Sequence, residues 1–208
     1  PASGNVVEPR AVGGRAGDPA PVWRTHPTVV KGNLRRRGCP LNTWTLSHRA
    51  DMDCLPIADR HYNRQKIGSP QFVPPGRCVV LKQPQAVWVT SWPFAEYVKH
   101  AWPGAWINSM FRNEGVGHYA SVMIREAISA TRAEWPDTPA LGIVTFIDPN
   151  EVTPRKIRGR STWGHSYFEA GFVHVGYTKG GLWVMQLTPD QMPEPAKAFV
   201  ATPLLERE

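Results

Sequence analysis

Residues 105–130 read AWINSMFRNEGVGHYASVMIREAISA and combine three local patterns. AWINSMF is an apolar run typical of a β-strand, RNEGVG is a turn with two glycines, and the apolar residues that follow are spaced as in a helix. That helix is expected to end near Trp135-Pro136. LGIVTFI, residues 141–147, is a β-branched run typical of a strand buried on both faces. The segment therefore predicts a β-α-β unit with parallel strands.

The flanking sequence extends this unit on both sides. CVVLK (78–82) and AVWVTSW (86–92) predict a hairpin, and FAEYVKHAW (94–102) a short helix. Downstream, SYFEAGF predicts a short helix, and VHVGYT and GLWVMQL a hairpin across residues 179–181. We therefore expect an α/β (α+β) domain over residues 39–190, a mixed β-sheet flanked by helices. A Pro/Gly/Arg-rich arm over 1–38 precedes it, and a Pro-rich tail over 191–208 follows and wraps its surface.

Composition restricts the setting of this domain. With 208 residues, 41% of them apolar, the chain can form one hydrophobic core. No apolar run approaches the roughly 18 residues of a membrane span, and no secretory signal is recognisable, so we expect no membrane association. Three cysteines without C-x-x-C spacing favour reduced thiols and a cytoplasmic protein. Cys39, His48, Cys54 and His61 match no familiar zinc spacing, so no metal site is predicted.

Positive charge is concentrated in two places. Of the net charge of +7, residues 1–38 contribute +5, from seven basic and two acidic side chains. Such clusters suit a polyanion such as double-stranded DNA, although a solvated tail and loop would give the same pattern. The basic residues assigned to DNA on this ground are Arg35, Arg36, Arg37, Arg155, Lys156, Arg158 and Arg160.

The glycine turn has the pattern R-x-x-G-x-G, formed by Arg112, Gly115 and Gly117. Glycines let backbone amides approach a ligand, and a helix N-terminus attracts anions, so the turn is suited to a pyrophosphate. An ordinary strand–helix turn is the alternative. The residues assigned to cofactor binding are Phe111, Arg112, Asn113, Glu114, Gly115, Val116, Gly117, His118 and Ser121.

Together with Tyr167-Phe168-Glu169-Ala170-Gly171-Phe172, this turn resembles the GCN5-related N-acetyltransferase fold. In that family the glycine turn holds the pyrophosphate of acetyl-CoA, and a tyrosine on a later helix protonates the leaving thiolate. The resemblance covers roughly residues 78–188. It implies a mixed sheet flanked by helices, and acetyl-CoA or a related CoA-like small-molecule donor; the basic N-terminal extension has no counterpart in the resemblance.

A narrower resemblance is to the phage Mom-type DNA modification proteins, a divergent branch of this fold. It is carried by His61-Tyr62-Asn63-Arg64, by the S-x-x-I-R of residues 121–125, by Asp148-Pro149 after a strand, and by the aromatic motif at 167–172. Asn63 stands where that family usually has serine. The resemblance covers about residues 55–180. It implies carbamoylmethylation of the exocyclic N6 of adenine in DNA, in the cytoplasm of an infected bacterial host, which protects the DNA from restriction.

Roles follow from this resemblance and leave alternatives open. His61 is a possible general base or a packed surface histidine, Asp148 orients the base or forms a structural turn, and Tyr167 is an acid or a helix anchor. The residues assigned to catalysis are His61, Tyr62, Ser109, Asp148 and Tyr167, and Asn63 and Arg64 are assigned to DNA. Either Asn108 or Ser109 should face the cleft, because neighbours in a strand alternate faces.

Two alternative functions stay open beside DNA modification. One is a conventional acetyl-CoA-dependent N-acetyltransferase of a small amine or protein lysine. The other is a DNA-binding module without catalysis. Because carbamoylmethylation and acetylation differ at the reacting carbon, the donor is not fixed by the fold, and iron is a weaker possibility.

Overall fold

The computed structural model describes residues 43–73, 75–115, 118–157 and 159–200. The chain separates into units of residues 1–38 and 39–208, and everything below concerns the second unit. Several residues singled out in the sequence lie outside the described residues: Arg35, Arg36, Arg37, Cys39, Val116, Gly117 and Arg158.

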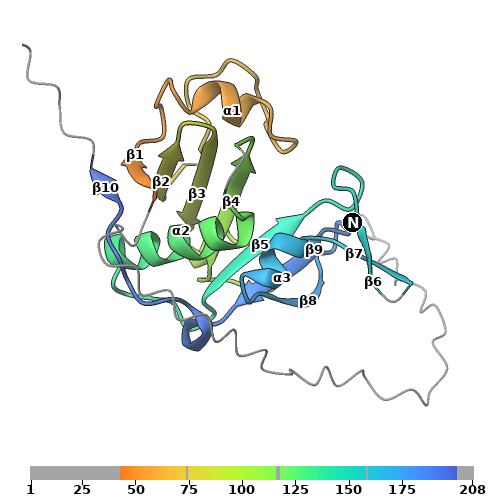
Figure 1. Cartoon of the computed structure of the whole chain (residues 1–208). Coiled ribbons are helices and arrows are strands. Elements are labelled where there is room, and N and C mark those ends of the chain that lie inside the picture. Colours follow the sequence, from red (N-terminus) through yellow and green to blue (C-terminus); the bar gives the residue numbers. More distant parts are fainter. Residues whose placement is uncertain (1–42, 74, 116–117, 158, 201–208) are drawn as a thin grey trace, which may run out of the picture. The chain divides into compact units, whose positions relative to one another are not determined.

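The domain is a mixed α/β fold built on one eight-stranded sheet (Figure 1). The strand order is β10-β1-β2-β3-β4-β5-β9-β8, in which β4–β5 and β1–β10 are parallel pairs and the other pairs are antiparallel. The strands of this sheet are β1 (Thr45–Ser47), β2 (Arg77–Gln83), β3 (Ala86–Trp92), β4 (Trp106–Asn113), β5 (Ile143–Ile147), β8 (Val173–Tyr177), β9 (Trp183–Leu187) and β10 (Phe199–Val200).

Within the described part of the chain, three helices and one separate hairpin accompany the sheet. The helices are α1 (Leu55–Asp59), α2 (Ala120–Glu134) and α3 (His165–Glu169), and the two-stranded hairpin is β6 (Arg155–Ile157) with β7 (Arg160–Thr162). Single 3-10 turns occupy Ala95–Tyr97 and Pro189–Gln191. None of these helices is long and apolar enough to cross a membrane.

Most of the predicted elements are confirmed, with two corrections. The β2–β3 and β8–β9 hairpins and the β4-α2-β5 unit with parallel strands are present. The predicted helix over 94–102 is wrong: a 3-10 turn at Ala95–Tyr97 lies between extended residues Phe94 and Val98. The segment expected to be a basic loop contains the β6–β7 hairpin, which turns at Gly159 with a positive φ of 77°.

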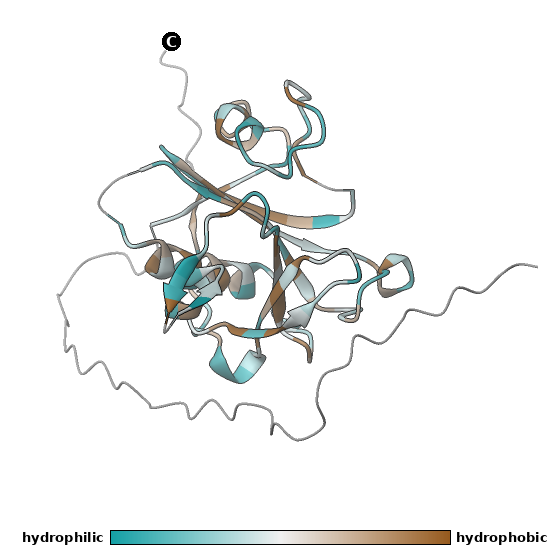
Figure 2. Cartoon of the chain, turned by 90° about the vertical axis from the view of Figure 1, so that its right-hand side faces the viewer, coloured by the Kyte–Doolittle hydropathy of each residue, from teal (hydrophilic) through white to brown (hydrophobic). Residues whose placement is uncertain are grey.

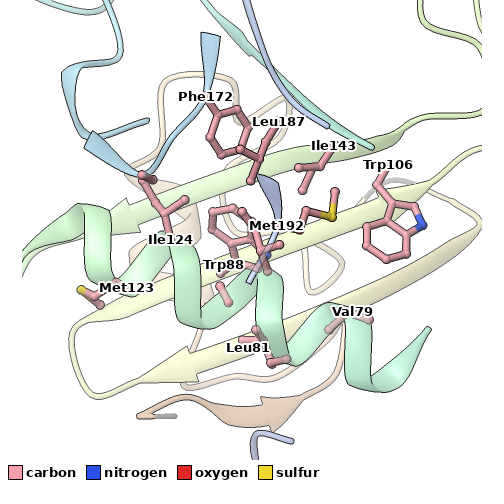
Figure 3. Close-up of a cluster of buried hydrophobic side chains, with 14 of the residues drawn as sticks. Val79, Leu81, Trp88, Trp106, Met123, Ile124, Ile143, Phe172, Leu187 and Met192 are labelled. Carbon is pink, nitrogen blue, oxygen red and sulfur yellow. The ribbon is translucent and has the colours of Figure 1, made fainter. Parts of the chain in front are cut away.

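The core lies on both faces of the central strands. On the face covered by α2, one cluster of buried side chains includes Leu81, Trp88 and Trp106 of the strands together with Met123 and Ile124 of α2 (Figure 3). On the other face a smaller cluster joins α1 to β2, β3 and β4 through residues such as Ile57, Val80, Val89 and Met110. Hydrophobic stretches follow the strands, and hydrophilic stretches follow the loops and the β6–β7 hairpin (Figure 2).

The tail after β9 packs along the domain and extends the sheet. The Ser129 hydroxyl donates to the Glu194 carbonyl, and Arg132 Nη1 donates to the Pro193 carbonyl at 2.6 Å. The Phe199 amide donates to the Trp44 carbonyl at 2.8 Å, where β10 pairs with β1. The described part of the tail is therefore attached to α2 and to the sheet edge.

The two central parallel strands separate after a short contact. Strands β4 and β5 pair only at Trp106–Ile143, Ile107–Val144 and Asn108–Thr145, although both continue further. The register between β3 and β4 shifts beside Thr90, so that Ser109 is the extra residue of a β-bulge. The bulge and the early end of the pairing open the sheet between β4 and β5.

Candidate active site

The opening between β4 and β5 contains a cavity of about 280 Å³. This is close to the lower end of the roughly 300–1,000 Å³ of small-molecule sites. Segments far apart in the sequence form its walls: the loop after α1, the second half of β4, the end of β5, the β6–β7 hairpin and α3. The lining residues used below are His61, Tyr62, Asn63, Asn108, Ser109, Phe111, Phe146, Thr153, Arg155, His165 and Tyr167.

Asn108 and Tyr167 form the buried centre of this cavity. The Tyr167 hydroxyl donates to Asn108 Oδ1 at 2.6 Å, and Asn108 Nδ2 donates to the carbonyls of Val89 and Met110 at 3.1 and 2.9 Å. Those two carbonyls fix the amide orientation, so Oδ1 must accept and the Tyr167 hydroxyl must donate. Burial raises the Tyr167 pKa. The phenol is therefore protonated at neutral pH, and Thr145 also bonds to its oxygen, which has a second lone pair as an acceptor.

His61 and Asn63 form a second polar pair on the opposite wall. Asn63 Nδ2 donates to the Ser109 carbonyl at 2.8 Å, so its Oδ1, 2.5 Å from His61 Nδ1, is an acceptor. The proton of the neutral ring then lies on Nδ1. The backbone amide of Asn63 also lies 3.3 Å from this nitrogen, but the contact with Oδ1 is shorter and therefore decides the tautomer. Burial lowers the His61 pKa, and Arg112 lowers it further. His61 Nε2 is thus an unprotonated nitrogen at neutral pH.

Tyr62 lies flat beside this histidine. The two ring centroids are 4.6 Å apart with an interplanar angle of 26°, and the Tyr62 hydroxyl donates to the Phe146 carbonyl at 3.3 Å. Burial raises the Tyr62 pKa. A stacked His–Tyr pair therefore reaches across the opening to the end of β5.

Ser109 and Asp148 are held in local structure. The Ser109 hydroxyl donates to Ser91 Oγ at 2.8 Å, so of the two neighbours it is the Asn108 side chain that bonds to Tyr167. Asp148 follows β5, and its Oδ1 accepts from the backbone amide and the side-chain amide of Asn150 at 2.9 and 3.0 Å. Asp148 is half-buried and is not among the lining residues. The contacts with Asn150 are those of a structural turn, but Asp148 also lies beside Tyr62: its backbone bonds to the Tyr62 hydroxyl, and its carboxylate adds to the effect of burial in raising the Tyr62 pKa.

The first part of the glycine turn is closed by ion pairs. Glu114 accepts from Arg112 Nε at 2.5 Å and from Arg60 Nε at 2.8 Å, and it also pairs with Arg60 Nη2. The hydrogen bonds from Arg60 and Arg112 lower the Glu114 pKa to about 2. Arg60 directly precedes His61, so this carboxylate links the turn to the wall of the cavity.

The described part of the glycine turn is occupied by its own hydrogen bonds and ion pairs. The Gly115 amide donates to Asn113 Oδ1 at 2.9 Å, and Glu114 places a negative charge beside Arg112. The N-cap of α2, Tyr119, makes no side-chain cap bond, so the first amides of this helix lack that partner. His118 is exposed and Ser121 is half-buried near the same end. Arg112 and the start of α2 thus fit a diphosphate, and Glu114 competes with it.

The β6–β7 hairpin places basic side chains at and near the cavity. Arg155 lines the cavity, and its Nη1 contacts His165 Nε2. Lys156 and Arg160 are exposed on the same hairpin. Arg64 differs from these residues: its side chain is only 7% exposed and bonds to Asp59 and to two loop carbonyls. Its guanidinium stabilises the loop after α1 and does not present donors to a DNA backbone.

Sequence reasoning missed three contributors to the site. Arg60 was not singled out, although it is adjacent to the H-Y-N-R motif. His165 lines the cavity two residues before Tyr167. Gly164 has a positive φ of 73°, and a Cβ there would lie 2.5 Å from Ile147 Cδ1 and Met185 Sδ. The W-G-H pattern before the aromatic motif was the available signal for the last two, because a glycine before a helix often marks a close approach.

Comparison with known proteins does not assign this site: no family model, no curated protein and no solved structure matches the chain. Among the residues the structure describes, no three His, Cys, Asp or Glu side chains group closely enough to hold a metal ion. Cys54, one of the thiols considered for such a group, is buried, and burial raises its pKa to about 11.

Proposed function

We propose that this protein is a transferase with a GCN5-related N-acetyltransferase-like fold that modifies the exocyclic N6 of adenine in double-stranded DNA. By its resemblance to the Mom-type proteins, the product is carbamoylmethylated adenine, which protects the DNA from restriction. The single observation that carries the proposal is the cavity between β4 and β5, where the His61-Tyr62-Asn63 segment meets Tyr167 beside a basic hairpin.

The arrangement of elements supports the fold assignment. Parallel strands β4 and β5 diverge, the R-x-x-G-x-G turn lies between β4 and α2, and Tyr167 on α3 bonds to the side chain of Asn108 on β4. The resemblance implies this order of turn, helix, strand and tyrosine. Since these elements are distant in sequence, their convergence on one cavity is more informative than either motif alone.

The chemistry begins with removal of adenine from the base stack. N6 lies inside a duplex, so the nucleotide must leave the helix at a cost of a few kcal/mol, which aromatic contacts in the pocket offset. The stacked His61–Tyr62 pair and Phe111 provide such contacts on the walls of the cavity. The Tyr167 oxygen, whose proton is directed to Asn108, accepts a hydrogen bond from an N–H of the base.

His61 acts as the general base that removes a proton from N6. The N6 amine is weakly nucleophilic because its lone pair is delocalised into the ring, so a base must take its proton as the new bond forms. One N6–H bond breaks, its proton passes to His61 Nε2, and N6 bonds to the donor's reactive carbon. That carbon's leaving group departs with the bonding electron pair. The donor class is therefore a carbamoylmethyl or acyl group attached to a good leaving group.

A CoA-like donor is the candidate for the turn beside the cavity, where Arg112 and the first amides of α2 would hold its diphosphate. A CoA thioester would supply an acyl carbon with a thiolate leaving group, and attack by an amine there would give an N-acyl product; carbamoylmethylation instead needs a donor whose CH₂ carbon carries the leaving group. Glu114 forms ion pairs with Arg60 and Arg112, so a diphosphate bound at the turn would replace Glu114 as the partner of these two arginines. This same turn is the observation that favours the second candidate function, a conventional N-acetyltransferase.

Nucleoside mass spectrometry of DNA from cells expressing the protein tests the proposal without knowledge of the donor. We expect a deoxyadenosine heavier by one carbamoylmethyl group. His61→Ala should abolish it, and His48→Ala, at an exposed histidine outside the cavity, should not. Unmodified deoxyadenosine with soluble, folded protein contradicts DNA modification. Acetylation of an added amine by the same protein would identify the N-acetyltransferase instead.

A further inference from the structure

A second cavity, of about 390 Å³, lies on the other side of Phe146 from the candidate active site. Phe146 belongs to β5 and lines both cavities. The second cavity is bounded by the segment before β4 and by the β8–β9 turn. The residues that matter below are Lys99, His100, Trp102, Phe146, Tyr177 and Lys179.

Aromatic rings dominate its walls. The His100 and Phe146 ring centroids are 4.8 Å apart, and those of Trp102 and Phe146 are 6.2 Å apart. Tyr177 is 56% exposed although it contacts Trp183 at 5.5 Å between centroids. A rigid aromatic platform that stays open to solvent is the kind of surface on which nucleobases stack, since every base has a π-face.

The charges and donors around these rings suit a nucleotide. Lys99 and Lys179 are exposed cations in the lining, and no acidic residue lines the cavity. The Trp102 amide donates to His100 Nδ1 at 3.1 Å, so the proton of the neutral ring lies on Nε2, which is buried and has no hydrogen-bond partner among the described residues. The exposed aromatic rings and the two cations match a ligand that combines a planar ring and an anion.

We propose that this second cavity binds an unstacked nucleotide of the DNA strand, next to the adenine that enters the first cavity. The inference rests on the proposed function, because it identifies the DNA subsite of the same enzyme. The base stacks on Tyr177 and Trp102, and Lys99 and Lys179 bind its phosphates. Phe146 separates the two nucleotides, as apolar side chains inserted between base steps do in kinked DNA.

Charge decides against a peptide or a small apolar ligand as the occupant. Two exposed lysines with no acidic partner in the lining favour an anionic chain. The proximity of the two cavities, which share the residue Phe146, further favours consecutive units of one polymer.

The experiment is fluorescence titration of two duplexes that carry 2-aminopurine, one fully paired and one with the 2-aminopurine unpaired in a single-base bulge. We expect the wild-type protein to bind the bulged duplex roughly ten-fold more tightly and to quench its fluorescence, because one base gains aromatic stacking. Tyr177→Ala should remove both effects. Tyr97→Ala is the matched control, since Tyr97 is 76% exposed and outside the cavity.

Salt dependence tests the phosphate contacts separately. Replacing Lys99 and Lys179 together by Gln should weaken binding of the bulged duplex and reduce its slope of log K against log salt by about two. Equal affinity of the wild-type protein for the two duplexes would overturn the inference. A bulge preference that survives Tyr177→Ala but is lost in His61→Ala would also overturn it, because the base would then occupy the first cavity.

Failure of this inference and failure of the proposed function are distinguishable. Modified deoxyadenosine in cells, together with no bulge preference in vitro, would leave the enzyme without this subsite. A bulge preference that depends on Tyr177, together with unmodified DNA, would establish the subsite and refute the enzyme.

Discussion

Among substitutions in the candidate active site, Asn108→Ala is expected to lower the free energy of unfolding of the domain most. Asn108 is buried and makes three short hydrogen bonds, two through Nδ2 and one to the Tyr167 hydroxyl, with a longer contact from Thr145 at 3.4 Å. At about 0.5–1.5 kcal/mol for each of the three, the free energy of unfolding should fall by roughly 1.5–4.5 kcal/mol. Tyr167→Phe removes one bond and should cost about 1 kcal/mol.

Urea unfolding followed by tryptophan fluorescence measures these losses. Asn113→Ala, on the same strand, is the matched control, since its side chain accepts one hydrogen bond, from Gly115, and a loss of about 1 kcal/mol is expected. In a double-mutant cycle, Asn108→Ala and Tyr167→Phe should be non-additive by 0.5 kcal/mol or more, because they share one bond. Additive losses, or an Asn108→Ala cost no larger than that of Asn113→Ala, would refute this hydrogen-bond assignment.

Three further predictions concern the base, the helix start and the hairpin. Activity should fall as pH drops through the His61 pKa, which burial holds below 6.5, because only the neutral ring accepts a proton; pH–rate profiles of modification measure this. Glu114, with a pKa of about 2, stays ionised over that range, so an acid limb that persists in His61→Gln would contradict the assignment. Gly164→Ala should lower the unfolding free energy by at least about 1 kcal/mol in urea titrations, from its positive φ and the contacts at 2.5 Å, and no loss would contradict the tight fit. Replacing Lys156 and Arg160 by Gln should reduce the salt slope of duplex binding by about two, and an unchanged slope would remove the hairpin from the DNA interface.

The β-α-β unit was predictable because its signals are local. Residues 105–147 alternate between apolar runs and helical spacing, and Pro136 follows the end of α2. The β6–β7 hairpin was not predictable in the same way, since RKI and RST carry no alternating apolar pattern. Strands β1 and β10 are three and two residues long, too short for any periodicity to show.

The site depended on register, which a single sequence does not reveal. The bulge at Ser109 decides that Asn108 bonds to Tyr167 while the Ser109 hydroxyl turns to Ser91. Arg64 shows that the sequence also does not reveal whether a basic side chain is available to a ligand. Its basic side chain suggested a DNA contact, but its partner Asp59 lies five residues earlier and holds it within the loop. Composition gives the number of cations, and the fold decides which of them are free.

The most direct measurement of the central claim is the amount of modified deoxyadenosine formed when the cavity is filled without removing a reactive group. Thr153 is exposed and lines the cavity, whereas Ser161 is exposed on the neighbouring hairpin and does not line it. Nucleoside mass spectrometry should show the modification lost in Thr153→Trp and retained in Ser161→Trp, with both proteins folded. Full modification by folded Thr153→Trp would contradict the claim that adenine reacts between β4 and β5.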